Sequence, residues 1–265
     1  MFKIAEAIGR LVLGTVSQIG GIFILLGQTL FWMFIGPFMK KPSSRSNIFE
    51  QMVFSGVNSI LIVFFVAFFT GIVLAMQSAY QLAQLGAEMY VASLVSVAMA
   101  REMGPVLTAL VVAGRVGAAI TAEIGSMQVT EQIEALQTQA LNPVRFLVVP
   151  RFLALVIMLP CITIFSDLVG MIGGYLVGIF NIGINSGMYI DITFKFLELK
   201  DIYTGLIKSV FFAMIIALIG CYMGLNTKGG AEGVGRSTTL SVVTSFILII
   251  LADCVLTGVF YFSQM

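Results

Sequence analysis

Long apolar runs constrain this chain more than any other feature. Residues 11–39 and 51–87 carry no charged side chain, and other strongly apolar runs cover 89–113, 146–183, 203–225 and 237–262. About 20 apolar residues are enough for a helix to cross the hydrocarbon core of a bilayer. Backbone groups in lipid must be bonded internally, and these runs are continuously apolar rather than alternating. We therefore predict membrane-spanning helices and not a barrel.

The composition excludes several classes of function. The 265 residues are 59% hydrophobic and only 10% charged, with a net charge of +1 and no histidine. Soluble domains carry about 25% charged residues, so one soluble core could not hide this apolar surface. Without histidine or a basic field, neither general-base catalysis nor nucleic-acid binding is indicated. Cys161, Cys221 and Cys254 lie far apart in apolar runs, which argues against a zinc site or a disulfide framework.

The basic residues between the runs predict a topology. Lys and Arg cluster at 40–45, 115–151 and 228–236, which the positive-inside rule places in the cytoplasm. Residues 77–87 and the tail after Asp253 contain neither, so we place them outside, together with the mixed connector 185–201. This pattern predicts five clear spans, with the N-terminus inside and the C-terminus outside.

The first apolar run remains ambiguous by this argument. Residues 11–39 have basic residues on both sides and five glycines within them. They fit either a helix that lies along the membrane surface or a sixth span. The following segment, 40–47, is a basic turn rich in proline and serine.

Five charged residues interrupt the predicted spans: Arg101, Glu102, Asp167, Lys208 and Asp253. Each costs at least about 2.5–3.5 kcal/mol at a helix centre, so each needs a partner or a polar path. Arg101 and Glu102 are adjacent and point in different directions, so at least one needs a partner on another helix. Lys208 is our candidate for Glu102. For these three a polar path and a structural pair stay equally open, whereas Asp167 and Asp253 are interpreted as groups that fix packing.

A polar stretch at 121–142 is predicted to be helical and to end at Pro143. It carries apolar residues at helical spacing, namely Ile124, Met127, Ile133 and Leu136. Such a face suits docking to a soluble partner. A membrane-surface helix without a partner is the alternative that composition favours.

The sequence contains two glycine-rich segments, and we interpret them differently. Residues 227–236 lack the G-x-x-x-x-G-K-[ST] pattern and follow no predicted strand, so we reject a nucleotide site there. Any ATP hydrolysis must then come from another chain. Small residues recur at three- and four-residue steps at Gly170, Gly173, Gly174 and Gly178, which permits close helix contact within or between subunits.

The central sequence closely resembles the MlaE/YrbE permease family. The resemblance is carried by AREMGPVLTALVVAGRVGAAITAEIGSMQVTEQIEAL at 100–136 and LNPVRFLVVPRFLALVIMLP at 141–160. It covers about 71–265, and the first ~50 residues match in character rather than in motif. These proteins are the membrane subunits of bacterial ABC transporters that work with MCE-domain proteins. Within the family the chain is more similar to the phospholipid branch than to the sterol-linked one.

The resemblance implies an all-α integral membrane protein. It has an N-terminal interfacial helix, five transmembrane helices and a cytoplasmic coupling helix between the second and third. The expected organisation is one permease domain over 1–265. Within it, 1–48 form the N-terminal helix and turn, 49–265 form the transmembrane core, and about 121–141 include the coupling helix.

The resemblance also implies a function and an assembly. The expected function is a permease that moves glycerophospholipids between inner and outer membranes and maintains outer-membrane lipid asymmetry. Expected partners are a second copy of the chain, two ATPase subunits, an MCE hexamer on the periplasmic face and a STAS-type regulator on the ATPase. ATP and Mg²⁺ would bind the ATPase, and this chain would bind no cofactor. The location would be the bacterial inner membrane, with a periplasmic C-terminus.

Site residues follow from the same resemblance. The residues expected to contact the ATPase are Glu123, Gly125, Met127, Glu131, Gln132 and Glu134. Arg101, Glu102 and Lys208 are predicted to form the polar rim of a substrate cavity. Arg101 or Lys208 there would meet a phosphate headgroup, and Glu102 would hold the cation in place.

Two other classes of function remain as alternatives. An ion-coupled secondary transporter would use Asp167, Glu102 and Asp253 as an ion path and would need no ATPase. An intramembrane scaffold would not transport, and charge substitutions in its spans would change only assembly and stability.

Overall fold

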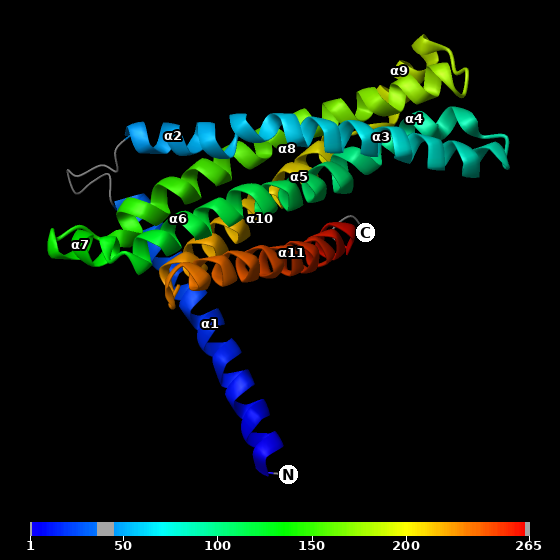
Figure 1. The fold of residues 1–265 in the computed structure, drawn as a ribbon. Coiled ribbons are helices and arrows are strands. Elements are labelled where there is room, and N and C mark those ends of the chain that lie inside the picture. Colours follow the sequence, from blue (N-terminus) through cyan, green and yellow to red (C-terminus); the bar gives the residue numbers. More distant parts are fainter. Residues whose placement is uncertain (1, 36–44, 263–265) are drawn as a thin grey trace.

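The computed structural model describes residues 2–35 and 45–262, with side chains described for 18–35 and 46–262. Within these ranges the regular structure is entirely helical, which confirms the predicted all-α class. The helices are α1 (Phe2–Ile35), α2 (Arg45–Ser55), α3 (Ile60–Ala83), α4 (Val91–Ala98), α5 (Gly104–Val112), α6 (Ala118–Val129), α7 (Gln132–Thr138), α8 (Val149–Phe180), α9 (Ser186–Phe196), α10 (Leu199–Leu225) and α11 (Gly230–Phe262). Figure 1 shows most of them side by side in one elongated bundle.

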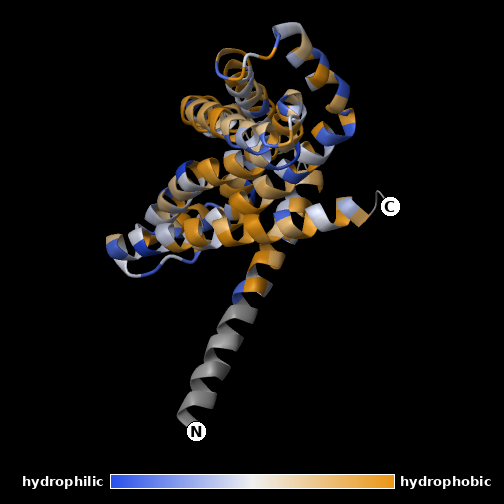
Figure 2. Ribbon diagram, turned by 90° about the vertical axis from the view of Figure 1, so that its right-hand side faces the viewer, coloured by the Kyte–Doolittle hydropathy of each residue, from blue (hydrophilic) through white to orange (hydrophobic). Residues whose placement is uncertain are grey.

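Six helical segments among the described residues are long and apolar enough to cross a membrane. They are Gln18–Ile35, Ser46–Ala83, Glu88–Val129, Val144–Phe180, Leu199–Leu225 and Gly230–Phe262. Hydrophobic residues cover most of their length, as Figure 2 shows. The chain is therefore a multi-pass membrane protein.

The N-terminal segment differs in its placement. By length and composition Gln18–Ile35 could form a span, but α1 leaves the bundle at a steep angle while the other five lie together (Figure 1). It contacts the bundle at one end, where Leu25 is buried and Gly21 lies against the ring of Tyr222. This arrangement favours the interfacial position implied by the resemblance.

Several boundaries differ from the sequence prediction. Helix α3 continues to Ala83, so most of 77–87, which we placed outside the membrane, is part of that helix. The second span continues beyond its apolar run of 89–113, and the guanidinium of Arg115 donates to the Phe54 carbonyl at 3.1 Å and to Ser59 Oγ at 2.7 Å. With its charge satisfied, the helix runs on to Val129. The connector 185–201 contains α9, and residues 36–44 of the predicted basic turn lie outside the described residues.

The predicted single helix over 121–142 is wrong. Helix α6 ends at Val129, and Glu131 adopts a left-handed φ of 59° before α7 begins at Gln132. A left-handed residue ends an α-helix because it turns the chain away from the helical path. The stretch is therefore the end of a span followed by a separate seven-residue helix.

Glycines bring α3 and α8 into close contact. A Cβ atom at Gly71 would strike the Gly170 carbonyl, and one at Gly173 would strike the Phe68 carbonyl. Gly174 and Gly178 make the same kind of approach to Val95 and Tyr189. The predicted close packing of this glycine stripe is confirmed, and it occurs within the subunit.

We expect Gly71→Ala to lower stability by about 1–3 kcal/mol, because the added methyl meets rigid backbone and forces two packed helices apart. Thermal unfolding of the purified protein in detergent measures the effect. Gly258→Ala on α11 is the matched control, since no atom of the described residues lies within 4 Å of its added Cβ. Equal melting temperatures for Gly71→Ala and the control would contradict this account of the packing.

Candidate functional site

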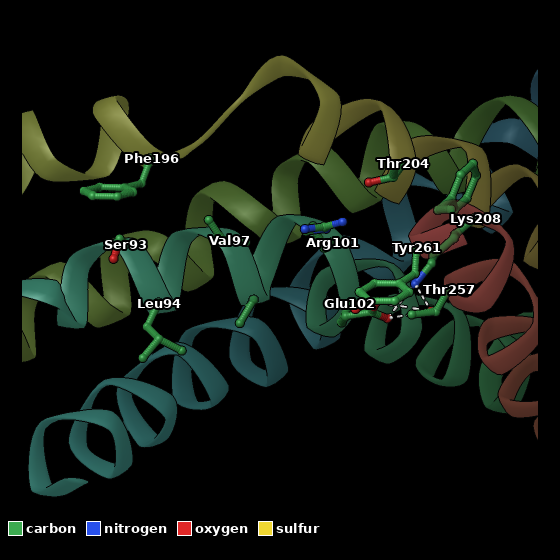
Figure 3. A pocket seen from close by; sticks show the side chains of 12 residues that line it. Ser93, Leu94, Val97, Arg101, Glu102, Phe196, Thr204, Lys208, Thr257 and Tyr261 are labelled. Atoms are coloured by element: carbon green, nitrogen blue, oxygen red, sulfur yellow. Dashed lines mark hydrogen bonds and ion pairs between the residues drawn. The ribbon is translucent and has the colours of Figure 1, made fainter. Parts of the chain in front are cut away.

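A cavity of about 510 Å³ opens between α4, the start of α10 and the end of α11. Its polar lining consists of Arg101, Glu102, Lys208, Thr204 and Thr257, with Ser93 further along. Figure 3 shows Glu102, Thr257 and Lys208 at one end and Leu94 and Phe196 at the other, with Arg101 between them. The cavity is thus charged at one end and largely apolar at the other.

The ammonium of Lys208 is at the centre of the charged end. Lys208 is 1% exposed, and its Nζ lies 2.5 Å from Glu102 Oε2, 2.7 Å from Thr257 Oγ1 and 2.9 Å from Asp253 Oδ1. Thr257 in turn donates to Glu102 Oε1 at 3.2 Å. The contacts to Glu102 and Thr257 are hydrogen bonds, whereas the contact to Asp253 is an ion pair without a hydrogen bond to Oδ1. The ammonium of Lys208 is therefore buried and surrounded by protein partners.

Arg101 differs from Lys208 in this respect. Its Nε lies 3.4 Å from Asp201 Oδ1, and its side chain is 34% exposed. The other oxygen of Asp201 accepts the Glu198 N–H in the capping box of α10. Among the described residues nothing bonds to the terminal nitrogens of Arg101. Among the described residues, Arg101 is therefore better placed than buried Lys208 to meet a phosphate.

A proline in the middle of the span shapes this region. Pro105 has no N–H, so the regular α-helical bonding cannot continue through it. The preceding residues Met99–Met103 form a π turn, in which the Gly104 N–H bonds to the Met99 carbonyl five residues back. The Ala100 carbonyl then faces Gly205, where a Cβ would strike it. This close approach brings α10 against both charges of the π turn.

The structure brings together most of the residues predicted for the site. Arg101, Glu102 and Lys208 line one cavity, and the predicted Glu102–Lys208 pair is confirmed. Asp253 pairs with the same ammonium, as expected for a group that fixes packing. Sequence reasoning missed Asp201, although it precedes Lys208 by seven residues and so lies on the same helix face.

Asp167 lies elsewhere. It is buried on α8 against Gly104, where any Cβ would strike its Oδ1. That oxygen has no hydrogen-bond partner among the described residues. Asp167 does not line the cavity, so it forms no continuous polar path with Glu102 and Asp253 there.

The stretch predicted to dock a soluble partner has an apolar face and a set of residues predicted for ATPase contact. Ile124 and Ile133 are buried, and Met127 and Leu136 pack against the same core, so this apolar face is covered by the chain itself. It is not a free docking surface, contrary to one interpretation of the sequence.

The polar residues of this region also differ from one another. Gly125 is buried, and a Cβ there would meet the Thr227 side chain. Glu123 forms an ion pair of 2.8 Å with buried Arg151. Glu123 is exposed as well but is held by this ion pair, whereas Glu131, Gln132 and Glu134 are exposed at the start of α7. Of the predicted contact residues, these three are the best placed for a partner.

No group of three or more His, Cys, Asp or Glu side chains in the described part of the chain is arranged to hold a metal ion. Cys221 is buried, Cys161 and Cys254 are exposed, and all three are free thiols. The candidate site is therefore a binding cavity whose chemistry lies in ion pairs and hydrogen bonds.

Replacing Lys208 by Met should lower stability by about 3–5 kcal/mol, because two carboxylates lose their buried counter-ion. Adding Glu102→Gln and Asp253→Asn to Lys208→Met should restore most of the loss. Exchanging the charges of Glu102 and Lys208 in a double variant is a weaker test, because the new carboxylate at position 208 would face Asp253. Melting temperatures of the single and triple variants measure both effects. A triple variant no more stable than Lys208→Met would refute the assignment of Lys208 as the counter-ion of these two carboxylates.

Comparison with known proteins places the chain in a family. The family model described as Permease MlaE matches residues 48–259. A probable ABC transporter permease protein of Rickettsia prowazekii is 42% identical over 261 residues, which cover 98% of this chain and 99% of the relative. A Synechocystis protein with the same description is 42% identical over 87% of this chain and 86% of its own length.

A third relative has a more specific name. The intermembrane phospholipid transport system permease protein MlaE of Haemophilus influenzae is 36% identical over 249 residues, covering 92% of this chain and 95% of the relative. The family match and these nearly full-length relatives agree with the membrane fold and the central motifs. The chain therefore belongs to the MlaE permease family.

Proposed function

We propose that this chain is the membrane permease subunit of an ABC transporter for lipids, and that its substrate is a glycerophospholipid. The observation that carries the proposal is the cavity between α4, α10 and α11, with a charged end and an apolar end inside membrane-spanning helices. A ligand matching both ends is amphipathic. The name of the Haemophilus relative supports the same substrate class.

In this proposal the cavity binds lipid through two kinds of contact. The free guanidinium donors of Arg101 bind the phosphate, since guanidinium and phosphate geometries match. Leu94, Val97 and Phe196 contact the acyl chains at the apolar end. Glu102 and Asp253 hold Lys208 in place, so that the ammonium keeps the helices together and does not itself bind phosphate.

Energy comes from a separate ATPase in this proposal. ATP and Mg²⁺ bind on that partner and not on this chain. The exposed start of α7, with Glu131, Gln132 and Glu134, contacts the ATPase, while the opposite face of α7 is packed into the core through Ile133 and Leu136. A helix fixed in this way transmits a push on its outer face to α6 and the rest of the bundle.

The wider assembly is proposed from the family. Residues 1–265 form one permease domain that pairs with a second copy of itself. An MCE hexamer sits on the periplasmic face, and a STAS-type regulator binds the ATPase. The chain lies in the bacterial inner membrane with its N-terminus in the cytoplasm and its C-terminus in the periplasm. Lipid exchange with the outer membrane would then maintain lipid asymmetry there.

Native mass spectrometry of the tagged chain, extracted gently from its own membranes, tests the proposal. We expect two copies of the chain, an ATPase pair, an MCE oligomer and retained phospholipid. Arg101→Gln should reduce the retained phospholipid about tenfold, because charge-assisted hydrogen bonds to the phosphate are lost. Lys195→Gln, at an exposed lysine of α9, is the control and should retain lipid normally.

A chain that emerges alone, without ATPase or enriched lipid in several mild detergents, would contradict the ABC assignment. The ion-coupled transporter would then be the function to test. Equal lipid retention by Arg101→Gln and the control would remove Arg101 from the site while leaving the assembly intact.

The proposed ATPase contact has its own test. Glu134→Arg should lower ATP hydrolysis by the assembled complex several-fold, because it reverses a charge at the contact, and it should leave the melting temperature unchanged since Glu134 is exposed. Glu88→Gln, at the opposite end of the bundle, is the control. Normal ATPase activity in Glu134→Arg would exclude this residue from the contact.

A further inference from the structure

The charges at the cavity do not balance. Among the described residues, the charged end contains two cations, Arg101 and Lys208, and three carboxylates, Glu102, Asp201 and Asp253. Two positive charges minus three negative ones leave a net charge of −1. An unbalanced charge inside a membrane is costly, so the cavity disfavours a ligand that adds a further net negative charge.

The excess charge belongs to one part of the cluster. Arg101 and Asp201 balance each other, whereas Lys208 faces both Glu102 and Asp253. Of these two carboxylates, Glu102 lines the cavity and its side chain is 33% exposed. Glu102 accepts from Lys208 and Thr257, and a carboxylate has about four acceptor positions, so it can accept from a ligand as well.

The neighbour of Glu102 offers the opposite chemistry. Arg101 is the adjacent residue on the same π turn, and its terminal nitrogens have no partner among the described residues. Together the two side chains present a donor site for an anion beside an acceptor site for a cation. That pair of sites is complementary to a headgroup that carries both charges.

We propose that the cavity selects phospholipids with a zwitterionic, primary-amine headgroup, with the phosphate on Arg101 and the ammonium on Glu102. The inference rests on the proposed function and names the headgroup class within it. An ethanolamine headgroup supplies a primary ammonium that donates to Glu102 and balances the headgroup's own phosphate, so the total charge stays at −1. A glycerol headgroup supplies the phosphate without an ammonium, so the total charge becomes −2.

The position of the cluster sets the orientation of the lipid. Lys208 is nine residues into α10, which begins at Leu199, so it lies roughly 14 Å below the helix start at 1.5 Å per residue. Leu94 and Phe196, at the apolar end, lie close to the start of α4 and the end of α9. The headgroup is therefore held deep in the bundle, and the acyl chains extend toward its end.

Competition between two lipids tests the headgroup class. The purified complex is equilibrated with detergent micelles that contain equal amounts of phosphatidylethanolamine and phosphatidylglycerol with identical acyl chains. Native mass spectrometry then gives the ratio of the two lipids retained. We expect about a tenfold excess of phosphatidylethanolamine, the effect of one charge-assisted hydrogen bond.

Three variants test whether the excess negative charge causes the preference for phosphatidylethanolamine. Glu102→Gln should bring the ratio close to parity, because Lys208 and Asp253 then balance. Asp253→Asn leaves the cavity lining intact and should also lower the ratio, so it decides the matter if Glu102→Gln fails to fold. Glu88→Gln removes an exposed carboxylate outside the cavity and should keep the wild-type ratio.

The outcomes of this experiment distinguish the headgroup inference from the proposed lipid-transport function. Equal retention of both lipids by the wild-type protein would overturn the headgroup inference while leaving the lipid-transport proposal in place. A phosphatidylethanolamine excess that survives both Glu102→Gln and Asp253→Asn would also overturn it. Retention of neither lipid would instead contradict the proposed function itself.

Discussion

The buried ammonium of Lys208 is the interaction on which this end of the bundle depends. It joins three parts of the chain, since Lys208 is on α10, Glu102 is on the π turn of the second span, and Asp253 and Thr257 are on α11. Helices in lipid gain little from the hydrophobic effect when they associate, so polar contacts and close packing must hold them. The ammonium of Lys208 supplies the polar contacts and draws these helices close together. It also places its carboxylate partner Glu102 at the cavity wall.

The other end of the bundle is held by the same kind of contact. Arg115 donates to groups of α2 and the turn that follows it, and buried Arg151 on α8 pairs with Glu123 on α6. Glu123 lies on α6, eight residues before Glu131 at the start of α7, and Arg151 lies in the first turn of the long helix α8. The two ends are connected by continuous helices, so a displacement near α7 has a rigid route to the cavity. The glycine contacts between α3 and α8 complete a frame with little room for independent helix motion.

Much of the fold could be predicted from residues alone. Charge-free runs predicted the spans, because apolar length is all that a bilayer requires of a helix. Adjacent charges in one span predicted that a partner must lie on another helix, and Lys208 was the correct choice for Glu102. Boundaries were less predictable. The chain turns at Glu131 within a stretch that has good helical spacing, and the second span continues past Arg115, beyond its apolar run. Both outcomes depend on neighbours distant in sequence.

The sequence by itself determined the membrane class, the helical architecture, the family and the identity of the charges that cannot stay unpaired in lipid. These follow from local chemistry, namely hydropathy, motif and the cost of burying charge. Only the tertiary structure decided which charged residues line the same cavity and which form ion pairs with one another. Lys208 is buried among Glu102, Thr257 and Asp253, and Asp201 reaches Arg101 because α10 approaches the π turn through Gly205. Such outcomes depend on distances between helices, which no spacing along a single chain records.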